Sequence, residues 1–243
     1  MIILNFGIPR SGTVWAFNVF RKIWDGRQVA YRTASPNSIA QVDECVASLD
    51  LRENVIVHGH DLTPAVLQLA AHPDVRPFFN YRDPRDVVVS QIRLHDVQLE
   101  SAIQMTAAAY RHLTEALCLP GITVIPFTHI AEHAEPLIFQ MATRLGILLK
   151  LSDVKAIAEQ TSAKHHRRIM ENVTAGGAGD ASGSIATAHL ASRSIRYDQN
   201  HLITDRHIQS GKNGRWREEL DADQQAEVQK RFTQLVDVLG FDE

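Results

Sequence analysis

The residues with the clearest chemical potential form a short loop near the start of the chain, Gly7-Ile-Pro-Arg-Ser-Gly-Thr-Val14. An apolar segment, 2–6, precedes the loop, and a helical pattern begins near Thr13. A strand, a glycine-bounded loop and a helix together present backbone N–H groups to an anion at the helix N-terminus. The segment therefore predicts a phosphate cradle.

The loop has the G-x-x-x-x-G frame of a Walker A motif but lacks its two chemical groups. Thr13 stands in place of the lysine, and Val14 in place of the hydroxyl residue that binds Mg²⁺. The basic group is Arg10, inside the loop. We therefore expect a phosphate ligand other than Mg-ATP.

Two further segments carry anion-binding groups. In Tyr81-Arg-Asp-Pro-Arg-Asp-Val-Val-Val-Ser90, Arg82 follows a predicted strand and Ser90 lies about two helical turns later. The planar guanidinium fork of arginine suits phosphate, although Arg82 has an alternative as a surface ion pair with a neighbouring carboxylate. The second segment, Ile208-Gln-Ser-Gly-Lys-Asn-Gly-Arg-Trp-Arg217, contains another glycine loop.

These three segments resemble, in order and location, the signature motifs of sulfotransferases that use 3′-phosphoadenosine-5′-phosphosulfate (PAPS). The first resembles the family's Pro-Lys/Arg-Ser-Gly-Thr-Thr-Trp phosphosulfate loop, the second its 3′-phosphate segment and the third its C-terminal Arg-Lys-Gly-x-x-Gly-x-Trp-Lys loop. The resemblance implies a P-loop NTPase-like fold and PAPS as co-substrate, without a metal. It also implies a set of donor-binding residues: Pro9, Arg10, Ser11, Gly12, Thr13, Val14, Trp15, Arg82, Ser90, Thr161, Ser162, Ser210, Gly211 and Lys212.

The same resemblance implies a catalytic histidine. His60 stands 22 positions before Arg82, the separation that the family keeps between its histidine and its 3′-phosphate arginine. A histidine pKa lies near ambient pH, which suits a general base. His58 occupies the position of a family lysine and is expected to be neutral or cationic only part of the time. Arg10 would stabilise charge on the transferred sulfuryl group.

Several positions depart from the family pattern. Val14 removes one hydroxyl, and Gln209 and Ser210 replace a basic pair, for which Lys212 and Arg206 are candidate substitutes. The role of Trp15 has two alternatives, stacking on adenine or packing in the core.

The elements that must position these residues follow an alternating pattern. Strands are expected at 2–6, 28–31, 54–58, 76–81 and 122–126, separated by helices that open at Ser35-Pro36, Thr63-Pro64 and Asp83-Pro84. Further helices are expected at 98–118, 130–145 and 151–173, with a last one capped by Asp221 and closed by Gly240. This pattern predicts a three-layer α/β fold: a mainly parallel sheet with helices on both faces and ligands at the carboxyl ends of its strands. One domain over 1–243 is expected, with a flexible Gly/Ser-rich lid around 174–187.

The composition fits this class. The net charge is −3, so nucleic acid is not an expected partner, and no apolar run reaches transmembrane length. Two distant cysteines are typical of a reduced, cytoplasmic protein. We expect sulfuryl transfer to a hydroxyl or amine of a small-molecule or carbohydrate acceptor, with the oligomeric state left open. Two other classes remain as alternatives, a divergent P-loop kinase or hydrolase and a non-catalytic nucleotide-binding module.

Overall fold

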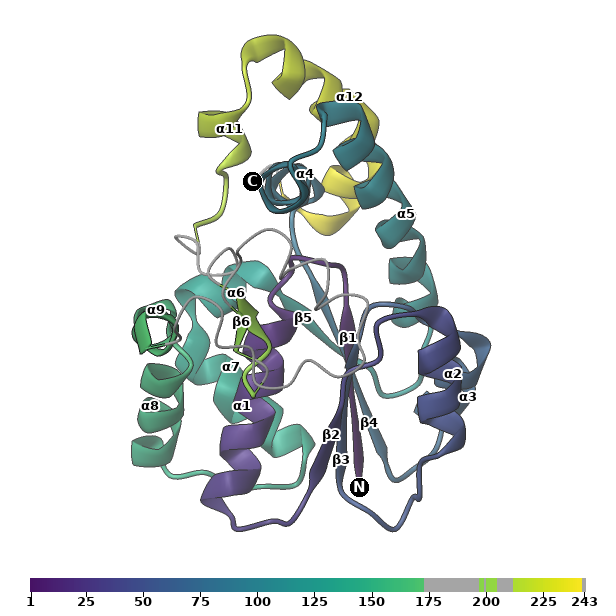
Figure 1. The fold of residues 1–243 in the computed structure, drawn as a ribbon, viewed down its shortest axis with the longest axis vertical. Coiled ribbons are helices and arrows are strands. Elements are labelled where there is room, and N and C mark those ends of the chain that lie inside the picture. The colour runs from purple at the N-terminus through teal and green to yellow at the C-terminus, as the bar shows by residue number, and fades with distance from the viewer. Residues whose placement is uncertain (173–196, 199, 205–211, 242–243) are drawn as a thin grey trace.

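The computed structural model describes residues 1–172, 197–198, 200–204 and 212–241. Its centre is a five-stranded parallel sheet of order β2-β3-β1-β4-β5, covered by helices on both faces (Figure 1). The strands are β1 (Ile2–Gly7), β2 (Arg32–Ala34), β3 (Val55–Gly59), β4 (Val75–Tyr81) and β5 (Thr123–Pro126). The three-layer fold predicted from the alternating pattern is confirmed.

The helices divide between the faces and the upper end of the molecule in Figure 1. Core contacts place α1 (Thr13–Gly26), α7 (Ala134–Arg144) and α8 (Leu151–Gln160) on one face, and α2 (Ile39–Ala47), α3 (Pro64–Ala70) and part of α5 (Leu99–Leu117) on the other. A third apolar cluster joins α4 (Pro84–His95) and α5 to α11 (Trp216–Glu219) and α12 (Ala222–Leu239). The remaining elements are α6 (Phe127–Glu132), α9 (Ala163–Asn172) and an antiparallel hairpin of β6 (Tyr197–Asp198) and β7 (Ile203–Thr204).

Four predicted boundaries were wrong. The second strand forms at Arg32–Ala34 instead of 28–31, because Gln28 takes a left-handed backbone conformation (φ 54°) where α1 ends. Helix α2 begins after Ser38, whose hydroxyl accepts the amide of Gln41, and not at Ser35-Pro36. The helices expected at 130–145 and 151–173 are each divided in two, at His133 and at Thr161-Ser162.

The central strand is fixed to its neighbour by buried amide side chains. Asn80 Nδ2 on β4 donates to Asn5 Oδ1 at 2.9 Å and to the Phe6 carbonyl at 3.1 Å. Asn5 Nδ2 in turn donates to the carbonyl of Thr13 at 2.8 Å. Because both side chains are fully buried, these bonds tie β1, β4 and the start of α1 into one rigid unit beneath the glycine loop.

No helix in the described ranges is long and apolar enough to cross a bilayer.

Replacement Asn5→Ala should destabilise the fold by roughly 1–3 kcal/mol, because it removes one buried hydrogen bond from Asn80 and one from the carbonyl of Thr13. Urea unfolding measures this loss. As a control, Gln104→Ala on the exposed side of α5 should change the free energy of unfolding by less than about 0.5 kcal/mol. Equal effects of the two changes would contradict the structural role of the Asn5 amide.

Candidate active site

The glycine loop after β1 is held in a tight, defined conformation. The Ile8 amide donates to the Asn80 carbonyl at 2.9 Å, and Ser11 Oγ lies 2.5 Å from the Ile8 carbonyl and 2.9 Å from that of Asn80. The Ser11 side chain is therefore used to shape the loop. Gly12 has φ 93°, and a Cβ there would lie 2.4 Å from Ile130 Cδ1, so only glycine fits.

The loop leads directly into the N-terminus of α1. Gly12 is the N-cap and provides no side-chain cap, so the first amides of the helix have no partner within the helix. Thr13 is buried, Pro9 and Val14 are half-buried, and Trp15 packs partly against the core on the α1 face. This arrangement can accept an anion on backbone N–H groups.

Arg10 turns from the loop toward α4. Its backbone is left-handed (φ 72°), and its Nε donates to Ser90 Oγ at 2.7 Å. Burial, with the guanidinium groups of Arg82 and Arg215 nearby, lowers the pKa of Arg10 to about 10. Arg10 remains cationic at neutral pH, and two positions predicted from separate motifs, Arg10 and Ser90, are in contact.

Arg82 is buried at the end of β4. One terminal nitrogen donates to Asp86 Oδ2 at 3.2 Å and to the Lys212 carbonyl at 2.9 Å, and its guanidinium stacks on Phe127 at 4.1 Å. The alternative of a surface ion pair is half right, since the pair with Asp86 exists but is buried. Arg82 Nε is buried without a hydrogen-bond partner, an orphaned donor of the kind that an anionic ligand satisfies.

Asp86 connects this region to the C-terminal loop. Its two carboxylate oxygens accept the amides of Gly214 at 2.9 Å and Trp216 at 3.1 Å, besides the guanidinium of Arg82. These bonds flank Arg215 and hold it beside Arg10 and Arg82. The sequence suggested Asp86 only as one possible ion-pair partner of Arg82, and it did not single out Phe127 or Arg215, although Arg215 lies in the C-terminal motif and its charge was a usable signal.

Arg215 is itself held by a carboxylate. Its guanidinium pairs with Glu219 at 2.5 Å, and Arg93 on α4 pairs with the other oxygen of Glu219, also at 2.5 Å. Among the described residues, three arginines (Arg82, Arg93 and Arg215) thus share two carboxylates, Asp86 and Glu219, and Arg10 lies near Arg82 and Arg215. This surplus of positive charge in a largely buried cluster favours a polyanionic ligand.

His60 lies at the carboxyl end of β3, beside the loop. Its Nδ1 is 2.8 Å from the carbonyl oxygen of Gly7. Because a carbonyl only accepts, Nδ1 carries the proton and the lone pair is on Nε2. Burial lowers the pKa of His60, so the ring is neutral near pH 7 and able to accept a proton.

His58, on the same strand, is neutral too. Burial lowers its pKa to about 3, with a smaller effect from His60. Its ring meets Phe17 edge-on at 5.7 Å and His60 at 5.5 Å, and its Nε2 is buried with no partner. Of the two expectations for His58, the structure favours the neutral ring over the part-time cation.

The other predicted site residues bond to carbonyl groups of the protein, are exposed or lie outside the described residues. The hydroxyls of Thr161 and Ser162 bond to the carbonyls of Ile157 and Glu159, at the junction of α8 and α9. Lys212 is exposed and presents its carbonyl to Arg82. Ser210, Gly211, Arg206, Gln209 and the lid at 174–187 lie outside the described residues.

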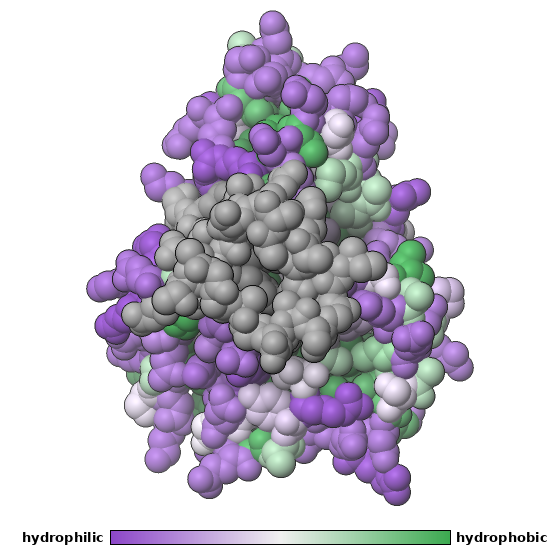
Figure 2. Space-filling view, viewed as in Figure 1, coloured by the Kyte–Doolittle hydropathy of each residue, from purple (hydrophilic) through white to green (hydrophobic). Residues whose placement is uncertain are grey.

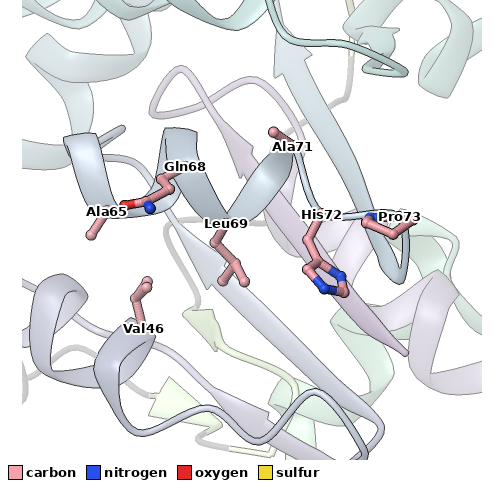
Figure 3. Close-up of a pocket in the computed structure, with 7 residues that line it drawn as sticks. All are labelled: Val46, Ala65, Gln68, Leu69, Ala71, His72 and Pro73. Carbon is pink, nitrogen blue, oxygen red and sulfur yellow. The ribbon is translucent and has the colours of Figure 1, made fainter.

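Two surface cavities are lined by residues other than the predicted site residues. One is formed between α2 and α3 by Val46, Leu69, His72 and their neighbours, and Figure 3 shows that it contains none of the predicted site residues. The other runs along α1 and β2. In the part of the chain that the structure describes, no group of three or more His, Cys, Asp or Glu side chains is placed to hold a metal ion.

Comparison with known proteins identifies the fold. No family model and no curated protein matches the sequence. Among solved structures, retinol dehydratase in complex with androsterone and the inactive cofactor PAP matches with a TM-score of 0.64 and 14% identity, over 97% of this chain and 80% of that one. The same enzyme with retinol and PAP matches at 0.64 and 16%, over 97% and 81%.

A mouse sulfotransferase, SULT7A1, complexed with PAP, matches with a TM-score of 0.61 and 16% identity, over 97% of this chain and 84% of that chain. At this identity the likeness concerns the fold. The chain has the P-loop-like α/β fold of sulfotransferases, as the motifs predicted.

The buried histidines should make stability depend on pH. The pKa of His58 is about 3 in the folded protein against 6.5 for an ordinary histidine, so between these values only the unfolded state binds the proton. The free energy of unfolding should therefore fall as pH drops below 6.5, by up to roughly 1.4 kcal/mol per pH unit for this residue.

Urea unfolding of His58→Gln at pH 7, 6 and 5 should show a smaller fall than the wild type. His72→Gln, away from the site, should keep the wild-type slope. An unchanged slope in His58→Gln would mean that His58 takes up its proton while the protein is folded.

Proposed function

We propose that this chain is a PAPS-dependent sulfotransferase that transfers a sulfuryl group to a hydroxyl or amine of a small-molecule or carbohydrate acceptor. The observation that carries the proposal is the hydrogen bond from His60 Nδ1 to the Gly7 carbonyl. This hydrogen bond holds the neutral ring of His60 against the glycine loop, which we propose binds phosphate. The structural neighbours are complexed with PAP, which supports the same donor.

The donor has two separate anionic ends, and the chain offers a site for each. The loop amides and Thr13, at the N-terminus of α1, would hold the 5′-phosphosulfate. Arg82, Ser90 and Arg215 would hold the 3′-phosphate, with Lys212, Ser210 and Gly211 in the adjoining loop. The orphaned Nε of Arg82 and the surplus of guanidinium groups fit such a ligand.

The position of the Arg10 side chain adds to the role that was predicted for this residue. Its side chain contacts Ser90, so in this conformation it contributes charge toward the 3′-phosphate end as well as to the loop. We also propose that Trp15, Thr161 and Ser162 lie on the adenine side of the donor, although the hydroxyls of Thr161 and Ser162 already have carbonyl partners.

In the proposed reaction, the acceptor oxygen attacks sulfur in line with the bridging oxygen of the donor. The new oxygen–sulfur bond forms as the bond between sulfur and the phosphate oxygen breaks. His60 Nε2 takes the acceptor proton, and the leaving bisphosphate keeps the electron pair. Positive charge and loop amides stabilise the developing charge on the leaving group.

The neutral state of His58 and the missing hydroxyl at Val14 both reduce the polar support for the sulfuryl group. His58 Nε2 is nonetheless available as a hydrogen-bonding atom next to His60. We propose that it orients the sulfuryl group without adding charge. The free cysteines Cys45 and Cys118 are consistent with work in the cytoplasm.

The kinase or hydrolase alternative is disfavoured by the same loop. Thr13 and Val14 provide neither the lysine nor the Mg²⁺ ligand of that class. Asp86, the nearby acidic side chain, is bonded to the C-terminal loop. The neutral His60 disfavours a purely nucleotide-binding module, because binding alone does not need a base.

Replacement His60→Asn should lower turnover by roughly 10²–10⁴-fold, because asparagine keeps a donor toward Gly7 but cannot accept the proton. The measurement is transfer of labelled sulfate from PAPS to a mixed panel of phenols, alcohols and oligosaccharides. The affinity for PAP should be unchanged. Wild-type turnover in His60→Asn would remove it as the base.

Replacement Arg215→Met should weaken PAP binding by about tenfold or more, because it removes one charge-assisted donor from the 3′-phosphate site. The matched control is Arg217→Met, two residues along, whose guanidinium stacks on the outer side of Trp216. It should bind PAP like the wild type. Equal affinities in both variants would exclude Arg215 from the donor site.

A further inference from the structure

A groove of about 620 Å³ runs along α1 at the edge of the sheet. One wall is α1 and the segment that follows it, a second is the edge strand β2, and a third is the tip of the β6–β7 hairpin, at Asn200 and Leu202. Figure 1 shows the hairpin lying alongside α1. Three segments distant in sequence therefore enclose one space.

The hairpin is fixed to α1 by polar bonds and does not merely lie over it. Asn18 Nδ2 donates to the His201 carbonyl at 2.9 Å, and Arg21 donates to the Asn200 carbonyl. His201 Nδ1 bonds to Asp198 Oδ2 at 2.6 Å within the hairpin. The third wall of the groove is thus held in place by hydrogen bonds.

The groove lies two rings away from the candidate base, separated from it by the buried side chains of Phe17 and His58. Phe17 lines the groove and contacts the ring of His58 at 5.7 Å, and His58 contacts His60 at 5.5 Å. At the same end lie Thr33 and Ser35, where β2 finishes. The carboxyl end of a parallel strand is where ligands of such sheets bind.

The lining of the groove is mainly polar. A carboxylate, guanidinium groups, hydroxyls and an amide line the groove, and the apolar part of its lining is smaller. The polar groups belong to Arg21, Asp25, Tyr31, Thr33, Ser35 and Asn200. The Tyr31 hydroxyl bonds to Asp25 at 2.8 Å, and Arg32 pairs with Glu53 at 2.8 Å. The wall thus offers both donors and acceptors, which hydroxyl-rich ligands need.

We propose that this groove binds the acceptor and that the acceptor is polyhydroxylated, an oligosaccharide. The inference rests on the proposed sulfotransferase function and adds the substrate class. An apolar acceptor placed here would leave polar groups of the groove without partners, which is costly. Sugar hydroxyls would instead bond to Asp25, Asn200 and Thr33, while the faces of the rings pack on the half-buried Tyr31.

An oligosaccharide acceptor would set this chain apart from retinol dehydratase, which was solved in complex with androsterone and with retinol. A site that hydrogen-bonds substrate hydroxyls rejects analogues that lack them by large factors, roughly 10⁴–10⁵. The acceptor preference should therefore be sharp.

The test uses the whole chain with sulfur-labelled PAPS and two sets of acceptors. One is an array of neutral and acidic oligosaccharides covering the common sugar linkages, and the other contains simple phenols, androsterone, retinol and fatty alcohols. We expect label in one or more oligosaccharides, with kcat/KM at least about 100-fold above any member of the second set.

Variants then connect the activity to the groove. Asp25→Ala and Thr33→Val, at exposed positions, should each raise KM for the labelled oligosaccharide by about tenfold, with kcat and PAP affinity near wild type. Asp43→Ala, exposed on α2 outside the groove, should leave KM unchanged.

Label in the phenols, sterol or alcohols with none in the oligosaccharides would overturn the inference, as would an unchanged KM in both groove variants. PAP binding with no label in either set would also overturn it. Failure to bind PAP at all would instead contradict the proposed function.

Discussion

The carboxylate of Asp86 is the interaction on which the candidate site depends. From the first turn of α4 it accepts bonds from Arg82, Gly214 and Trp216, which belong to the end of β4 and to the C-terminal loop. A buried carboxylate is stable only when it is paired and hydrogen-bonded. Asp86 satisfies this condition through Arg82 and through the two amides that flank Arg215, so the electrostatics of the fold and the assembly of the site have the same cause.

The two sides of the candidate site differ in charge. At the α4 end, arginines outnumber the carboxylates that hold them, and burial does not remove the charge of Arg10. At the end of β3, burial keeps both histidines neutral. A positive region beside a neutral base suits a reaction in which a polyanionic leaving group departs while the nucleophile loses a proton. The glycine loop lies between these regions and contacts both, through Arg10 and the Gly7 carbonyl.

Much of this arrangement was predictable from local patterns. The strand that ends at Gly7, the Thr63 and Asp83 caps and the Gly240 stop are all determined by nearby residues, and the structure has them. The placement of His60 beside the loop followed from the resemblance in spacing, and the parallel register of β1 with β3 explains it, because Phe6 pairs with Gly59.

The parts that the sequence did not reveal depend on tertiary contacts. The left-handed Gln28 delays β2, and the division at His133 allows α6 to bring Ile130 and Phe127 against Gly12. The roles of Asp86 and Arg215 arise from contacts across about 130 positions, which no local pattern encodes. The neutrality of His58 likewise follows from its burial on a central strand.

The central claim, that this site holds a bisphosphorylated adenosine without a metal, is tested most directly by calorimetric titration. Adenosine 3′,5′-bisphosphate titrated in the presence of EDTA should bind to one site per chain, and Arg82→Ala should bind it at least about tenfold more weakly. Mg-ATP should compete poorly. Tight binding of Mg-ATP, together with no binding of the bisphosphate in EDTA, would contradict the account.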